Sequence, residues 1–304
     1  MKRQIRLFAT VMVCMAMALC VSCKKDDDSS DSGGGNGGGN TGGGGGSSQT
    51  VEMRISKMSF NVVEYKEEST DGGQTWNVID VDSVQANMIF TWNNNLLSKW
   101  EIAGDYVYDF RYDNNKLSNA IWTNMNDGRI DTVACYDVEY DGDNMSEVTY
   151  HEKENGHDYD KVYHLEYSNG KLSSVIYEHV RNYFWNGDNL SEIRSAGYGD
   201  GVSFLSYDDK KNPFYGIDAF LLISLDNSAA MYNIIEEVCC LSLSKNNCNK
   251  YEDLLEEWMT TGTNDYTYND KNYPTQAVVN MIISNPDGYH RLRDVRTYTY
   301  EYLD

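Results

Sequence analysis

Four histidines lie close together in the chain and are the first candidates for chemistry. They are His151, His157, His164 and His179, and imidazole can bind a metal ion or transfer protons near neutral pH. Two of them could meet over a metal if they lie on neighbouring strands. The stretch has neither the H-E-x-x-H spacing nor that of a facial triad, so we expect scattered surface histidines and no metal site.

Turns rich in Asp and Asn offer the oxygen ligands that calcium prefers. Two of them are 126–128, with sequence Asn-Asp-Gly, and 141–144, with sequence Asp-Gly-Asp-Asn. A twelve-residue calcium loop is not completed, because Val148 stands where a bidentate glutamate belongs. Tight hairpin turns require the same residue types. We therefore expect no cofactor, with calcium binding by these turns as the alternative.

Catalytic motifs do not stand out in the chain. Its 47 acidic residues guarantee carboxylate pairs by chance, so a glycosidase pair cannot be identified from composition. G-x-S-x-G, phosphate-binding-loop and dinucleotide fingerprints do not occur. We therefore expect a protein that is not an enzyme, with a glycan-active hydrolase as the alternative.

Tryptophan rings are stronger candidates for ligand contact. Flat aromatic faces can stack on sugars while Asn and Asp side chains reach the hydroxyl groups, and exposed rings mark binding surfaces. The alternative is that the rings form the packed face of a sheet. The formal net charge of −22 repels phosphate backbones, so no nucleic-acid partner is expected. The predicted ligand is a glycan or another envelope protein, contacted by Trp92, Trp100, Trp122 and Trp185.

The first residues have the pattern of an export signal. Lys2, Arg3 and Arg6 precede an apolar run at 7–19, which is too short to span a bilayer as a helix. Residues 19–22 resemble a relaxed bacterial lipobox, so we expect a signal peptide at 1–22 and a lipid on Cys23. Cys20 stands where the lipobox usually has leucine, and ordinary secretion is the alternative.

A flexible tether follows Cys23. Residues 24–28, Lys-Lys-Asp-Asp-Asp, resemble the signal that sends Bacteroidota lipoproteins to the outer face of the outer membrane. A tether that only avoids inner-membrane retention, leaving the protein facing the periplasm, is the alternative. Residues 23–50 include eleven glycines, and such a coil spans about 28 Å on average. The membrane is therefore a predicted partner through the lipid anchor, and residues 51–304 form the folded domain.

Four further cysteines remain in the mature chain. They are Cys135, Cys239, Cys240 and Cys248. An exported protein meets an oxidising compartment, so a disulfide between Cys248 and one of the adjacent pair, written as Cys240–Cys248, is a candidate. A zinc site is not expected, because paired C-x-x-C spacing does not occur.

A nine-residue unit recurs and predicts the body of the fold. It consists of an aromatic residue, a four-residue polar turn, an apolar residue, Ser, and a mostly apolar residue three positions after the first. Strict alternation before each turn, as in Tyr106, Tyr108 and Phe110, indicates strands, and the three-residue offset after the turn predicts a β-bulge. The five copies begin at Trp92, Tyr112, Tyr140, Tyr167 and Trp185.

This unit resembles the tyrosine–aspartate hairpin repeats of bacterial surface proteins, and more closely a family of Bacteroidota lipoproteins of unknown function. The resemblance covers roughly residues 84–304. It implies a mainly β fold, a curved antiparallel sheet or partial barrel, in a protein anchored to the outer membrane and facing the cell exterior. Because the family has no established activity, it implies no chemistry.

Apolar residues at three- and four-residue intervals predict a helical insertion at 218–259. One or two helices are expected after Asp218, and a further short helix from Tyr251 to Met259. We expect this insertion to cover one face of the sheet. Together these features predict a surface-tethered binding lipoprotein, with a purely structural surface coat as a further alternative.

Overall fold

The computed structural model describes residues 53–102, 106–126, 129–154, 157–196, 201–225, 242–255, 258–284 and 288–303. The predicted signal peptide, Cys23 and the tether lie outside these ranges, as do Cys239 and Cys240. Within them, no helix has the length and apolar character needed to cross a membrane.

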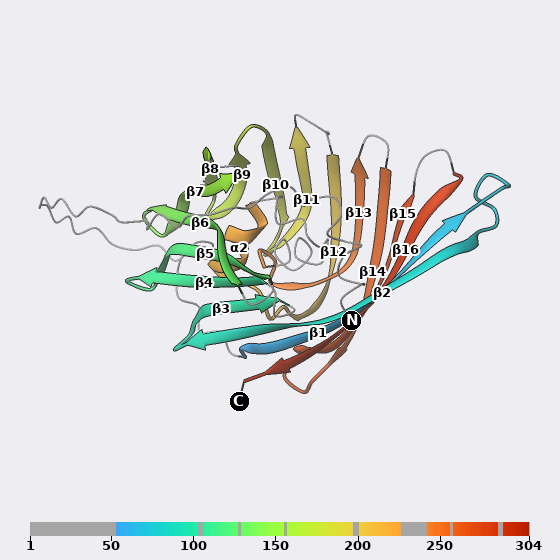
Figure 1. Ribbon diagram of the computed structural model, residues 1–304, viewed down its shortest axis with the longest axis horizontal. Coiled ribbons are helices and arrows are strands. Elements are labelled where there is room, and N and C mark those ends of the chain that lie inside the picture. Colours follow the sequence, from blue (N-terminus) through green and yellow to red (C-terminus); the bar gives the residue numbers. More distant parts are fainter. Residues whose placement is uncertain are drawn as a thin grey trace, which may run out of the picture.

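The described residues form a closed antiparallel ring of strands (Figure 1), which we call the wall. Each strand pairs with the strands before and after it in the chain, and the last pairs back with the first. The prediction of a mainly β, single antiparallel sheet is confirmed, and the sheet closes where a partial barrel was expected. The strands are β1 Ile55–Glu68, β2 Asn77–Asn93, β3 Leu96–Ile102, β4 Tyr106–Asp113, β5 Lys116–Asn126, β6 Arg129–Asp141, β7 Asn144–Glu154, β8 His157–Ser168, β9 Lys171–Ile176, β10 Val180–Asn186, β11 Asn189–Ala196, β12 Gly201–Lys211, β13 Asn246–Leu255, β14 Trp258–Tyr268, β15 Pro274–Ser284 and β16 His290–Tyr302.

Each copy of the repeat forms a hairpin with a two-residue turn. Asn94, Asn114 and Asn169 begin three of these turns with φ of 56°, 50° and 53°. Gly142 and Gly187 begin the other two with φ of 60° and 57°. Asn and Gly are the residues that tolerate this left-handed backbone most readily, so the predicted turns are confirmed.

The repeat serine is the extra residue of a β-bulge in all five hairpins. In the first, Thr91 pairs with Lys99 and Trp92 with Leu97, so Ser98 has no partner in the ladder. Four of these serines donate an Oγ hydrogen bond of 3.0–3.2 Å to the carbonyl seven residues earlier, which stabilises the bulge. The predicted bulge is confirmed, and its five serines are Ser98, Ser118, Ser146, Ser173 and Ser191.

The repeat aromatic fills the wedge where neighbouring hairpins diverge. Strands β9 and β10 pair only from Ser174 to Ile176, so the carbonyl of Leu172 lies beyond that ladder. The Trp185 indole donates to it, because a buried carbonyl without a partner would destabilise the fold. Three such bonds, of 2.7, 2.8 and 2.7 Å, run from Trp92 to Ile55, from Tyr112 to Leu97 and from Trp185 to Leu172.

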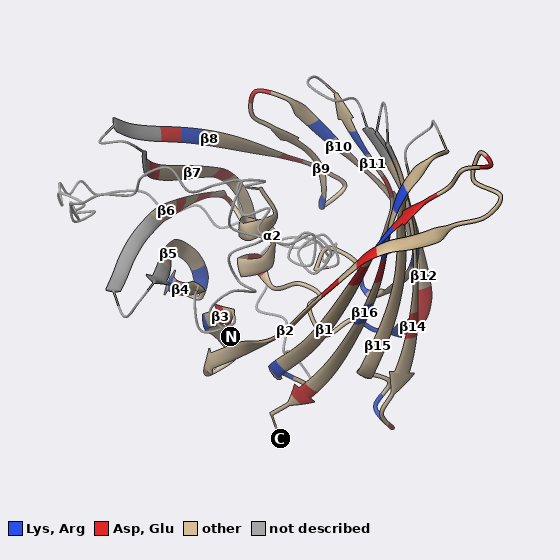
Figure 2. Cartoon of the chain, turned by 45° about the vertical axis from the view of Figure 1, so that its right-hand side comes forward, with Lys and Arg blue, Asp and Glu red and all other residues tan. Residues whose placement is uncertain are grey.

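The interior of the ring is filled on one side by helix α2, Asp218–Leu225 (Figures 1 and 2). Seven of its eight residues are buried. Phe220 packs edge-on against Trp100 and Phe90, with ring centroids 5.5 and 6.0 Å apart. The expected helical cover over one face of the sheet is thus confirmed for 218–225.

The predicted short helix from Tyr251 to Met259 is wrong. Residues up to Leu255 belong to β13, and β14 begins at Trp258. Leu255 pairs with Trp258 and Leu254 with Met259, so the segment is a hairpin. A short apolar run cannot be assigned to helix or strand by periodicity alone, and pairing with β12 decides the outcome here. Residues 226–241 of the predicted insertion lie outside the described residues, and 242–250 form a turn segment and the start of β13, not a helix.

Candidate functional site

The predicted tryptophans do not form one exposed surface. Trp100 and Trp122 are 0% and 8% exposed, and they belong to a row of stacked rings that crosses four strands inside the wall. Successive centroids in this row, from Phe90 through Trp100 and Tyr108 to Trp122, are 5.9, 5.6 and 5.9 Å apart. Trp92 and Trp185 are half-buried in the wedges described above. A ligand role for these four rings stays a prediction.

Two of the four histidines lie beside carboxylates on the outside of the wall. The ring nitrogens of His151 are 2.8 Å from Asp160 and 3.2 Å from Asp137. His164 is 3.1 Å from Glu147. Across the described ranges, no group of three or more His, Cys, Asp or Glu side chains is placed to hold a metal ion.

The acidic turns bind lysines. Lys116 donates to the carbonyl of Gly142 and lies 3.1 Å from the Asp143 carboxylate. It also lies over the Tyr140 ring, 5.2 Å from its centroid. One carboxylate considered for calcium in this turn, that of Asp143, is therefore engaged by an ammonium group from the neighbouring hairpin.

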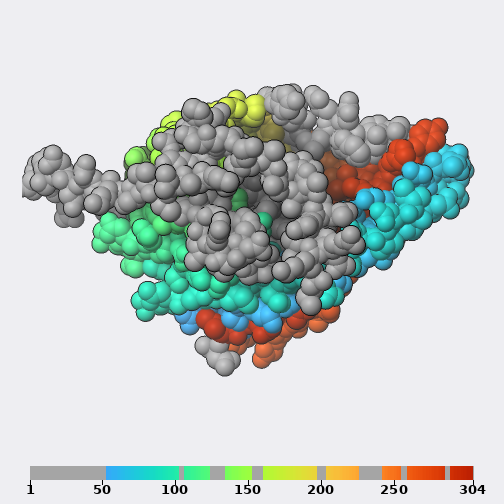
Figure 3. All heavy atoms as spheres, viewed as in Figure 1, coloured from blue at the N-terminus to red at the C-terminus, as the bar shows by residue number. Residues whose placement is uncertain are grey.

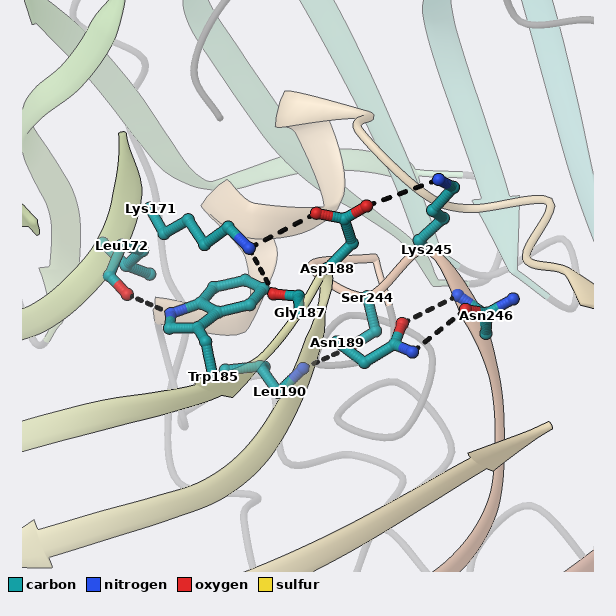
Figure 4. A network of polar contacts seen from close by, with 10 residues as sticks. All are labelled: Lys171, Leu172, Trp185, Gly187, Asp188, Asn189, Leu190, Ser244, Lys245 and Asn246. Atoms are coloured by element: carbon teal, nitrogen blue, oxygen red, sulfur yellow. Dashed lines mark hydrogen bonds and ion pairs between the residues drawn. The ribbon is translucent and has the colours of Figure 1, made fainter. Parts of the chain in front are cut away.

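A second lysine contact ties the wall to the segment that follows α2 (Figure 4). Lys171 donates to the Gly187 carbonyl, and its Nζ is 3.3 Å from Asp188. Lys245 reaches the other oxygen of Asp188, also at 3.3 Å. Hydrogen bonds from Lys171 and Lys245 lower the pKa of the Asp188 carboxyl. This network anchors the chain where it rejoins the wall, so we read it as structural.

The side-chain amides complete that anchor. The backbone N–H of Asn246 donates to Asn189, and the Asn189 amide donates back to Asn246, both at 3.0 Å. The backbone N–H of Leu190 donates to Ser244 at 3.1 Å. Cys248 follows two residues later and is buried, with Sγ 3.3 Å from the carbonyl oxygen of Lys250. Its predicted disulfide partner Cys240 lies outside the described residues.

Asp218, at the start of α2, lies among tyrosines of the repeat. The Tyr140 hydroxyl donates to its carboxylate at 3.3 Å. Burial raises the pKa of Asp218, opposed by this hydrogen bond and by the charge of Lys116. Burial and the charge of Asp218 also raise the pKa of Tyr112 and Tyr167. Tyrosines from three hairpins therefore surround one carboxyl and hold α2 in place.

An arm projects from the body and differs from the rest of the wall. We define the arm as residues 63–87 of β1, β2 and their connection, with residues 288–296 leading into and along β16. Its outer end stands clear of the body on the right of Figures 1 and 3. The tip is ordered by Asp71, which accepts hydrogen bonds from Thr75, Ser69 and Gln74; these lower the pKa of its carboxyl to about 2.

One face of the arm carries stacked arginines. Glu67 is 5% exposed and accepts hydrogen bonds from Arg291 at 2.6 Å and Arg293 at 3.1 Å. Burial raises the pKa of Glu67, but these two hydrogen bonds outweigh it, and the net pKa is lowered. Arg291 lies 4.2 Å from the centroid of Trp76, and Arg293 lies 3.9 Å from that of Tyr65. The guanidinium groups therefore fix these rings on the arm.

The opposite, inward face of the arm is acidic. Glu64 pairs across the ladder with Asp294 on one side and with Asp82 on the other. Arg296 donates to Asp294 at 2.9 Å, and the two are 2% and 6% exposed. The second carboxylate oxygen of Asp294 is buried without a hydrogen-bond partner among the described residues. Figure 2 marks the acidic positions along β1 and β2 in red.

Removing the charge of Glu64 is expected to stabilise the protein near neutral pH. Burial and then the charge of Asp294 raise the pKa of Glu64, so the carboxyl contributes stability below its unfolded pKa and loses it as pH rises through the folded pKa. Glu64→Gln should raise Tm by up to a few degrees at pH 7.5 and leave it unchanged at pH 4, measured by calorimetry. An equal shift at both pH values, or a lower Tm at pH 7.5, would contradict this expectation.

Neither the arm nor the Asp218 cluster was predicted from the sequence. One available signal was the run from 291 to 296, which holds three arginines in a chain with 25 basic residues and a net charge of −22. Which face of the strand each arginine occupies follows from the pairing of β16 with β1, which places Arg293 and Arg296 on opposite faces.

Comparison with known proteins adds little to this geometry. No protein-family model and no curated protein matches the chain. A porin-like protein of Bacteroides uniformis is similar in structure, with a TM-score of 0.42, 12% identity, and coverage of 82% of this chain and 98% of that one. A porin-like protein of Bacteroides vulgatus has a TM-score of 0.34, 10% identity, and coverage of 83% and 99%. Similarities at this level assign neither a family nor a function.

Proposed function

We propose that this chain is a non-catalytic binding module, held on the outer face of the outer membrane by a lipid on Cys23. The observation that carries the proposal is the helix packed inside the ring of strands. Phe220 is 0% exposed among the rings of β2 and β3, and the carboxyl of Asp218 accepts a hydrogen bond from Tyr140. A closed sheet with a helix packed inside it is a rigid body that can bind a partner on its outer surface.

The outward positions of the wall support the same proposal. In β1 the buried residues Met58 and Phe60 alternate with Lys57, Ser59 and Asn61. Lys57 forms an ion pair of 2.8 Å with Glu301 on β16. On β7, Glu147 and His151 also face outward, and each lies beside a polar partner, His164 and Asp137. A wall in contact with lipid would carry an apolar band in these positions, so the outward faces of β1 and β7 favour water.

The partner class is a glycan or another envelope protein. Exposed aromatic and apolar side chains support a binding surface, and the arm carries several of them, with Tyr289 49% exposed and Trp76 stacked on Arg291. Rings held flat by a guanidinium are suited to stacking on a sugar. The arm is also the part of the described chain that projects from the body (Figure 3).

A binding screen tests the proposal directly. The mature chain from residue 23, with Cys23→Ser to prevent lipid attachment, is applied to a glycan array, to soluble polysaccharides and to isolated outer-membrane proteins, with calcium and with chelator. We expect specific binding without cleavage, lost in Trp76→Ala and retained in Trp185→Phe. Cleavage of a bound glycan would establish a hydrolase instead. Absence of binding to every class would establish a structural coat.

A further inference from the structure

The arm contains a long strand edge that no described strand covers. Strand β3 ends at Ile102, which pairs with Met88. Residues 77–87 of β2 therefore pair with β1 alone among the described residues. Their side chains are correspondingly open, with Val78, Ile79 and Val81 exposed by 48%, 57% and 54%.

An edge of this kind is a template for another strand. Its backbone groups that face away from β1 can form a ladder with an extended chain. The N–H groups of Val81 and Ser83 donate at 3.0 Å to the carboxylates of Asp80 and Asp82, and an added strand would take the place of these local bonds. Natural proteins shorten, twist or charge such edges to prevent unwanted pairing. Here the edge spans eleven residues, includes β-branched Val78, Ile79 and Val81, and retains only Asp80 and Asp82 as charged positions.

The charges on the inward face select the occupant. Asp80 and Asp82 face the same side as Glu64, which pairs with Asp82 in the ladder. Lys66 lies 3.3 Å from Asp80, and Asp294 lies on the far side of Glu64. A strand added to the edge would place alternate side chains beside Asp80 and Asp82, so basic residues at those positions would be stabilised.

The other face of an added strand meets different neighbours. Val81 and Ser83 face outward, opposite Tyr65 and Val63 of β1. Apolar or β-branched side chains suit positions beside Val81. Antiparallel pairing of two β2 edges about Val81 or Asp82 would bring aspartates directly opposite one another, which disfavours a second copy in these two registers.

We propose that residues 77–87 of β2 bind an extended segment of a partner protein in which Lys or Arg alternates with β-branched residues. The segment adds a strand to the wall at the arm. Backbone hydrogen bonds supply affinity, and the carboxylates of Asp80 and Asp82 supply selectivity. The inference rests on the proposed binding function and names the partner as polypeptide.

A peptide titration tests both parts of the proposal. The probe is a fluorescein-labelled nine-residue peptide of alternating lysine and valine, measured by anisotropy against the lipid-free mature chain. A peptide of alternating glutamate and valine tests charge selectivity. A lysine–valine peptide methylated on alternate backbone nitrogens keeps every side chain but loses the donors of one edge, so it tests strand addition.

Binding of the lysine–valine peptide, weakened about tenfold or more by either change to the peptide, is the expected result. Asp80→Lys with Asp82→Lys should weaken it similarly, while Asp109→Lys with Asp113→Lys, the same charge change on exposed residues of β4, should weaken it far less. Equal binding of the methylated peptide would overturn strand addition. Equal loss in the β4 control would reduce the effect to net charge.

Two other results would also overturn the proposal. Sedimentation of a dimer that Val81→Lys dissociates would make a second copy the occupant of the edge. Failure of the peptide to bind a protein that binds a glycan in the array would reject the polypeptide partner and leave the proposed function intact. Failure in both experiments would reject the proposed function itself.

Discussion

Phe220→Ala is expected to lower the free energy of unfolding by about 4 kcal/mol, the upper part of the range for a buried phenylalanine. The ring is 0% exposed and makes edge-to-face contacts with Phe90, Trp100 and Phe214 at 6.0, 5.5 and 5.3 Å. Its removal leaves a cavity where the helix meets the stacked rings. Urea unfolding followed by tryptophan fluorescence measures the loss.

An exposed phenylalanine provides the control for this substitution. Phe184 is 41% exposed on β10 and has the Arg194 guanidinium 4.9 Å from its ring centroid. Phe184→Ala should cost less than about 1 kcal/mol, since it removes one exposed stacking contact and creates no cavity. Equal costs for the two substitutions would mean that α2 does not support the wall.

Asp294→Ala is expected to lower the free energy of unfolding by about 3 kcal/mol, because it leaves the guanidinium of Arg296 buried without its carboxylate. The two side chains are joined at 2.9 Å and are 6% and 2% exposed. The substitution also removes the repulsion between Asp294 and Glu64, which offsets part of the loss. Urea unfolding at neutral pH measures the result.

Replacing both members of the pair tests whether Asp294→Ala is destabilising because it leaves a buried charge or because it disturbs packing. Asp294→Leu combined with Arg296→Met fills the site with apolar side chains and removes both charges, so it should cost much less than Asp294→Ala alone. We expect the double variant to change the free energy of unfolding little. A double variant as unstable as Asp294→Ala would show that the pair contributes through shape and hydrogen bonding, not through charge compensation.

The hairpins were predictable because each depends on residues a few positions apart. Asn or Gly at the first turn position accounts for the reversal, and the Ser that follows the apolar residue accounts for the bulge. These are local effects of backbone strain and side-chain hydrogen bonding. The three-residue offset in the repeat was enough to place the bulge before any pairing was known.

Closure of the sheet and the strand at Tyr251 depend on distant residues. Nothing near Tyr251 distinguishes helix from strand, whereas its pairing with Leu205 and Gly262 does. The ring of Tyr251 lies over Gly262, where an added Cβ would come within 2.0 Å of it. Such complementarity is a property of the assembled sheet, so short-range periodicity could not reveal it.

For the same reason, the sequence could not show which candidate residues are exposed or lie close together. Trp100 and Trp122 were candidates because of their chemistry, but the fold packs both into the interior. In the sequence, Asp218 is an ordinary acidic residue at the start of a predicted helix. Its position among tyrosines from three hairpins is visible only in the folded structure. Exposure and proximity are results of tertiary structure, and they decide which aromatic or acidic residues can meet a ligand.

The junction of the first and last strands also has a consequence for how the chain folds. The N–H of Leu303 donates to Arg54 at 2.8 Å, and Lys57 meets Glu301 across 244 positions of sequence. Every other strand pair joins strands that are consecutive in the chain. We therefore expect these pairs to form first, and the β1–β16 pair to form last because it requires closure of a long loop. A circular permutant that joins 54 to 303 and opens the turn at Asn169 would make this pair local and move the slow closing step to β8 and β9.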